Sequence, residues 1–154
     1  MSKFAENTTV SAEKSRAEIE TLLRKHSIHD IAVMSMQGHS VIAFQRGTVS
    51  YRLSIAAINP DAHEFTHTRQ NWLRSDSDKE RLIAQENRRR WRAMLLVLKG
   101  KLVAAADGVV TFEQEFLAYA ITADKRTVGE IIIPQLEHGS LEMTQLALPG
   151  VPNG

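Results

Sequence analysis

The chain has 154 residues, of which 43% are hydrophobic and 24% charged, and its net charge is +1; this composition is typical of a globular domain and excludes wholesale disorder. It contains no cysteine, which excludes disulfide scaffolds, thiolate zinc sites and cysteine nucleophiles. No run of about 18 apolar residues occurs and the polar first ten residues do not resemble a signal peptide, so we expect a cytoplasmic protein without a membrane span.

The first third of the chain changes from helical to strand periodicity. Residues 11–26 have apolar side chains at helical spacing, behind Ser11 as a suitable cap. Residues 31–36 and 41–46 have strand character, and residues 49–57 alternate between apolar and polar side chains. Because the connections are short, we expect these three strands to form an antiparallel meander.

The rest of the chain is predicted to be helical after a long loop at residues 62–76. Residues 77–80 match a capping box, from which a long helix is expected to run to Ala106. Two further boxes, at Thr111 and Thr127, predict two short helices. The helix and the third strand are expected to bury Leu53, Ile55, Trp91, Leu95, Leu98 and Leu102.

The expected fold class is therefore α+β: a helix, a three-stranded antiparallel meander, a long helix packed on the sheet and two short C-terminal helices. We expect residues 11–146 to form this single domain. Residues 1–10 are predicted to be a flexible arm, and residues 147–154, with two prolines and two glycines, a loose tail.

Charge is segregated along the chain. Residues 69–101 contain ten Lys/Arg against four Asp/Glu, a net charge of +6, whereas residues 102–154 contain two against seven, a net charge of −5. This pattern indicates an anion-binding surface or a contact between copies of the chain. The alternative is a basic helix face that an acidic helix of the same chain neutralises.

Four basic side chains of the long helix recur at steps of seven, four and seven, which places them in one stripe. Arginine guanidinium groups bind phosphates through paired donors, and a tryptophan between two arginines in the preceding loop can stack on a base. The candidate nucleic-acid-binding residues are Arg69, Trp72, Arg74, Arg81, Arg88, Arg89, Arg92 and Lys99. The alternative is a solvent-facing stripe with Glu86 and Asp78 as partners and Trp72 as a lid over the core.

Histidines offer two weaker patterns. Residues 63–67 match the H-E-x-x-H spacing of zinc proteases, but without a helical apolar stripe or a distinctive third ligand. His26, His29 and Asp30 are interpreted as a polar helix end. We therefore expect no metal, no cofactor and no catalytic site.

The element order over residues 11–106 resembles the double-stranded-RNA-binding domain and the core of single-strand annealing proteins, the recombination mediators. The first likeness is the weaker, because that domain begins its last helix with a lysine-rich cluster, whereas residues 77–80 here are Ser-Asp-Lys-Glu. Likeness to the annealing proteins implies single-stranded DNA as ligand and a homo-oligomer whose basic side chains line a backbone groove.

The chain also resembles a family of small, uncharacterised phage and prophage proteins. This resemblance implies a phage-associated protein in a bacterial cytosol and transfers no site residue. The segments that carry it are residues 3–10, 14–20, 64–68, 90–93, 111–118 and 126–130.

Two functions follow as competing hypotheses. The first is a non-enzymatic protein that binds nucleic acid, single strands above all, as a homo-oligomer with an apolar subunit contact through Phe112, Phe116 and residues 131–133. The second is a phage accessory protein whose basic helix faces an acidic host protein and which binds no nucleic acid.

Overall fold

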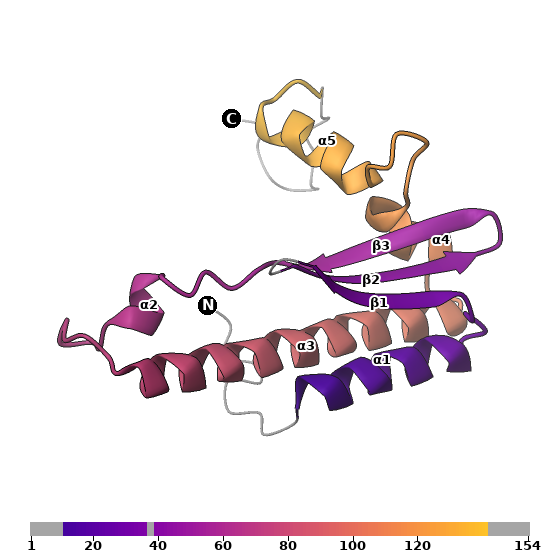
Figure 1. Cartoon of the computed structure of the whole chain (residues 1–154). Helices are drawn as coiled ribbons and strands as arrows, with labels where there is room; N and C mark the ends of the chain where they lie inside the picture. Colours follow the sequence, from indigo (N-terminus) through magenta and orange to yellow (C-terminus); the bar gives the residue numbers. More distant parts are fainter. Residues whose placement is uncertain (1–10, 37–38, 142–154) are drawn as a thin grey trace, which may run out of the picture.

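A computed structural model describes residues 11–36 and 39–141, and it has the expected α+β order (Figure 1). The arm predicted at residues 1–10 and the tail predicted at 147–154 lie outside the described residues. The elements are α1 (Ala12–Lys25), β1 (Ile31–Met36), β2 (His39–Arg46), β3 (Val49–Ile55), α2 (His63–Thr66), α3 (Asp76–Ala106), α4 (Phe112–Phe116), the 3-10 helix η1 (Leu117–Tyr119) and α5 (Val128–Glu137).

The sheet is the antiparallel meander expected from the short connections, in the order β1-β2-β3. Gly47, with φ 62°, lies in the tight turn between β2 and β3, where a left-handed backbone favours glycine. The strand alternation places Ile42 and Leu53 opposite each other on one face, and both are fully buried. This face of the sheet therefore meets the helices.

Helices α1 and α3 lie side by side on that face and run in the same direction (Figure 1). All six residues predicted for the core are buried, which confirms the prediction that the long helix covers the sheet. Phe112 and Phe116 join the core as ring contacts of Phe44 and Tyr51. Their expected role in a subunit contact is wrong, because the core already buries them to 7% and 0% exposure.

Two details of the helical half differ from expectation. The long helix begins at Asp76, because the Ser75 side chain accepts a hydrogen bond from the Asp78 amide and caps the helix two residues before the expected box. The segment before it is not a featureless loop, since it contains the one-turn helix α2. Both boxes predicted at Thr111 and Thr127 are present.

Helix α5 lies across the sheet from α1 and α3 (Figure 1). The Arg52 guanidinium, on the outward face of β3, donates to both carboxylate oxygens of Glu130 at 3.0 and 2.8 Å. A Cβ on Gly129 would lie 2.9 Å from the Ala118 carbonyl oxygen, so only glycine fits there. None of the helices within the described ranges combines the length and apolar character needed to cross a bilayer.

Candidate nucleic-acid interface

The predicted basic stripe of α3 flanks the buried stripe. At 3.6 residues per turn, Arg81, Arg88, Arg92 and Lys99 are turned by roughly 70° from the centre of the Trp91–Leu102 face. Arg92 and Lys99 lie on the side of α3 that borders α1, and Arg88 and Arg92 are half-buried. The stripe exists as predicted, but the packing of α1 decides how much of it solvent can reach.

Acidic partners within the chain hold two of the four residues of this stripe, and also Arg89 beside it. Arg81 pairs with Asp78 at 3.3 Å, Arg89 with Glu86 at 2.7 Å, and Arg92 with Glu18 of α1 at 2.9 Å. The acidic C-terminal part also neutralises cations of the same chain, since Glu113, Glu115 and Glu130 bind Arg46, Lys101 and Arg52. Only the Lys101–Glu115 pair joins the basic segment to the acidic one, so the described ion pairs compensate the charge segregation only in part within one copy.

Glu86 is the centre of the best-formed charge cluster on α3. Its carboxylate accepts from Arg89 and Arg90 at 2.7 Å, and Arg90 also donates to the Ala56 and Ala57 carbonyl oxygens. The hydrogen bond from Arg89, helped by that from Arg90, holds the pKa of Glu86 below its ordinary value of 4.5 against the opposing effect of burial. Glu86 thereby links the helix to the chain that follows β3.

We predict that the Glu86 cluster contributes stability that acid removes. A carboxyl group whose pKa is lowered by folding stabilises the fold above its unfolded pKa, and this contribution is lost as pH falls through the folded value. Glu86→Gln should cost about 1 kcal/mol at neutral pH, and the difference from wild type should shrink between about pH 5 and pH 3. Urea unfolding across this range measures it.

Asp78→Asn provides the control, because the Asp78–Arg81 pair is exposed on both sides and an exposed pair contributes little. The prediction would be contradicted if Glu86→Gln lowered the free energy of unfolding by the same amount at neutral and at acidic pH.

A groove of about 440 Å³ runs between α1 and α3 and gathers cations from both helices. Lys14 and Lys25 line it from α1, and Lys99 lines it from α3, while Ala17, Leu22, Leu95 and Leu96 form its apolar part. None of these three lysines forms an ion pair with a described residue, whereas Arg92, also in the groove, is held by Glu18. The groove therefore combines unpaired lysine side chains with an apolar lining.

The amino-acid sequence did not lead to Lys14 and Lys25 as candidate binding residues, because the charge pattern was considered for each helix separately. Their signal was present: residues 14, 18, 21 and 25 recur at steps of four, three and four and carry no apolar side chain. Only the packing of α1 against α3 shows that this polar face and Lys99 line the same groove.

Trp72 lies at the tip of an ordered loop that precedes α3. Its side chain is 73% exposed and that of Leu73 is 78% exposed, so the alternative of a lid over the core is wrong. The Thr68 amide donates to the Trp72 carbonyl at 2.8 Å, and a β-bridge joins His67 to Leu73. A loop closed by backbone hydrogen bonds thus presents an indole ring to solvent.

The two loop arginines differ in their availability. Arg69 is exposed and forms no ion pair with a described residue, whereas the Arg74 Nε donates to the His67 carbonyl at 3.0 Å and is half-buried. Arg69 is therefore free to reach a ligand beside Trp72, while Arg74 holds the base of the loop.

The H-E-x-x-H residues form part of the same loop base. The rings of His63 and His67 stack with 4.6 Å between centroids, and His63 Nε2 lies 2.9 Å from the Asn71 side-chain oxygen. Within residues 11–36 and 39–141, no group of three or more His, Asp or Glu side chains is placed to hold a metal ion, and this includes His26, His29 and Asp30. These histidines support the loop that carries Trp72.

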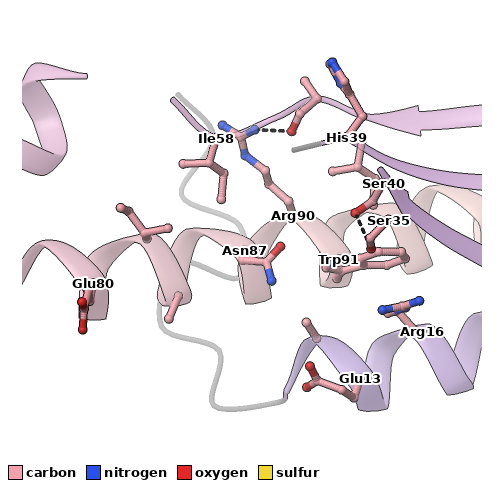
Figure 2. A pocket seen from close by; sticks show the side chains of 15 residues that line it. Glu13, Arg16, Ser35, His39, Ser40, Ile58, Glu80, Asn87, Arg90 and Trp91 are labelled. Atoms are coloured by element: carbon pink, nitrogen blue, oxygen red, sulfur yellow. Dashed lines mark hydrogen bonds between the residues drawn. The ribbon is translucent and has the colours of Figure 1, made fainter. Parts of the chain in front are cut away.

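A second pocket, of about 530 Å³, opens at the end of the sheet between α1 and α3 (Figure 2). Arg16 reaches over the Trp91 ring at 5.3 Å from its centroid, and Arg90 points to the backbone beyond β3. Glu13 and Glu80 also line this pocket, so its charges are mixed. It therefore selects an anion less well than the groove between α1 and α3.

The predicted residues do not converge on one compact site. At 1.5 Å per residue, the start of α3 beside the Trp72 loop and Lys99 lie about 35 Å apart. Arg81, Arg88 and Arg92 lie between them in order. This layout suits a long ligand rather than a small molecule.

No protein-family model, curated protein or solved structure matches the chain.

Proposed function

We propose that this chain binds nucleic acid without catalysing a reaction, that single-stranded DNA is its preferred ligand, and that it acts in phage recombination. The observation that carries the proposal is the groove lined by Lys14, Lys25 and Lys99, whose ammonium groups lack carboxylate partners among the described residues. Unpaired cations along a groove are suited to a nucleic-acid backbone with regularly spaced phosphates.

The Trp72 loop supports a single strand in particular. An exposed indole on a hydrogen-bonded loop can stack on an unpaired base of any sequence, while Arg69 beside it contacts the phosphate. A base inside a duplex offers no such face. The roughly 35 Å between this loop and Lys99 gives a strand several successive contacts along α3.

An acidic host protein is the second candidate, and two observations favour it. Leu22, Leu95 and Leu96 line the groove, so an amphipathic acidic helix can bury apolar side chains between the lysines. In addition, Asp78 and Glu18 already hold two arginines of the stripe, and Glu86 holds Arg89 beside it, which leaves fewer cations for phosphates.

The two candidates differ in their response to salt, and the test is a titration of fluorescently labelled single- and double-stranded oligonucleotides. About four phosphate contacts predict that single-strand affinity falls roughly fiftyfold between 50 and 200 mM salt. Trp72→Ala should weaken single-strand binding by about tenfold, because stacking on one base contributes about 1–3 kcal/mol.

Duplex binding should change little in the Trp72→Ala variant, which makes the duplex the internal control. No oligonucleotide binding by wild type at low salt would refute the proposed function and leave the acidic protein partner. If Trp72→Ala left single-strand binding unchanged, the Trp72 loop would not be part of the interface.

A further inference from the structure

Strand β1 has an open outer edge. Its inner edge pairs with β2 in an unbroken register of six residue pairs, from Ile31 opposite Phe44 to Met36 opposite His39. At the other side of the sheet, β3 is closed by its own chain: Tyr51 forms a bridge with Ala120, and the Ile121 amide donates to Ser50. No described residue pairs with the outer edge of β1.

The sequence of β1 lacks the features that usually protect such an edge. Ile-Ala-Val-Met-Ser-Met contains no charged residue, no proline and no glycine, and the unbroken register leaves no bulge. Natural edge strands are commonly guarded by lysine, proline, a bulge or a covering segment. An uncharged, regular edge is a template for another strand.

The outward face beside this edge is also apolar. Ala32 lies opposite Ala43, and Met34, which is 44% exposed, lies opposite Val41. A sheet face that meets only water normally carries polar side chains at these alternate positions. On the helix-facing side, Ile31 and Val33 at the edge are only half-buried.

The backbone geometry determines which residues an added strand would meet. The Gln45 amide donates to the Asp30 carbonyl, which makes these two residues a hydrogen-bonded pair of the β1–β2 ladder. Because the ladder alternates, the main-chain groups of Ile31, Val33 and Ser35 point to the outer edge. A partner strand must therefore pair with these three residues.

We propose that this edge is the interface of a two-fold dimer in which β1 pairs antiparallel with β1 of a second copy. With Val33 on the two-fold axis, Ile31 of one copy pairs with Ser35 of the other, and Met34 packs beside Ala32 of the other. No charge opposes a like charge within the strand, so the edge is self-complementary. The result is a six-stranded sheet with both α1–α3 layers on the same side.

A second copy is favoured over a foreign strand because residues 31–35 meet both requirements of a symmetric contact. Ile31, Val33 and Ser35 supply the edge-facing amides and carbonyls, and the uncharged Ala32 and Met34 lie opposite each other across the axis. The inference does not depend on nucleic-acid binding, and it is an alternative to the subunit contact that the sequence placed at Phe112, Phe116 and residues 131–133.

Cysteine cross-linking tests the register, since the natural chain has no cysteine. Residues 32 and 34 of opposing copies form a non-hydrogen-bonded pair, with Cα atoms about 4.5 Å apart and within disulfide reach. An oxidised mixture of Ala32→Cys and Met34→Cys proteins should give a disulfide dimer on a non-reducing gel. Each variant alone should give much less, because like positions lie diagonally across the axis.

Solution mass tests the interface itself. By light scattering, wild type should have twice the chain mass of 17.3 kDa. Ser35→Pro removes an edge-facing amide that the β1–β2 ladder does not use, and it should give folded monomers by circular dichroism. Ser35→Thr keeps the amide and should stay dimeric. Met34→Lys provides a second route to monomers if the proline variant fails to fold.

Two results would overturn the proposal. One is a wild-type mass of a single chain at every concentration tested. The other is a dimer that persists in Ser35→Pro and Met34→Lys, together with no disulfide in the mixed oxidation.

Discussion

Trp91→Ala should destabilise the fold by about 3–5 kcal/mol, the usual cost of removing a large aromatic side chain from a core. Trp91 is 2% exposed and lies where α3, α1 and the end of the sheet meet. Arg16 covers its ring at 5.3 Å, so the substitution also removes a cation–π contact. Against a typical total of about 5–15 kcal/mol, this loss leaves a marginal protein.

Chemical unfolding followed by circular dichroism measures this effect, and the other tryptophan provides a matched control. Trp72→Ala makes the same change at a side chain that is 73% exposed, and it should alter the free energy of unfolding by less than about 0.5 kcal/mol. For a chain of this length, the Trp91 variant should melt roughly 10–15 °C lower than wild type. A loss below about 1 kcal/mol would place Trp91 outside the core.

The second large effect is expected in the groove between α1 and α3. Lys25→Glu combined with Lys99→Glu should weaken single-strand binding by about two orders of magnitude or more, because two charge-assisted contacts to phosphate become repulsive. Removing two contacts should also lower the slope of log affinity against log salt by about 1.4. Neither lysine has an acidic partner among the described residues, so the fold loses no ion pair.

A matched control with the same change in net charge is Arg24→Glu combined with Lys125→Glu. Arg24 is exposed in the last turn of α1, as Lys25 is, but it does not line the groove, and Lys125 lies in the turn before α5. This control should lose only the small part of affinity that depends on overall charge. Equal losses in both variants would show that the groove is not the interface.

Mutation of the groove also separates binding from assembly. The proposed dimer uses β1, whose side chains and open edge do not line the groove between α1 and α3. The Lys25/Lys99 variant should therefore keep the mass of wild type, whereas Ser35→Pro should become monomeric and still bind a short oligonucleotide. In a two-fold dimer the two grooves face the same side, so a longer strand can engage both and bind more tightly.

The order of elements and the composition of the core follow from local patterns in the amino-acid sequence. Apolar periodicity of 3.6 and of 2 depends only on residues a few positions apart, so the local pattern is sufficient to locate α1, the three strands and α3. The boxes at Thr111 and Thr127 are equally local, since each side chain bonds an amide three residues away. The start of α3 was misplaced because Ser75 and Ser77 are both suitable caps, and the folded chain uses Ser75.

The availability of charged and aromatic residues to a ligand depends instead on long-range packing. Arg92 is neutralised by Glu18, 74 residues away, because α1 packs beside α3 in a register that no local pattern reveals. The same packing brings Lys25 and Lys99 into one groove. Trp72 and Trp91 are alike as residues, yet the chain path buries one and exposes the other. Hydrophobic burial determines which faces of the helices and the sheet meet. The charged side chains at the edges of these faces are then brought together, whatever their separation in the sequence.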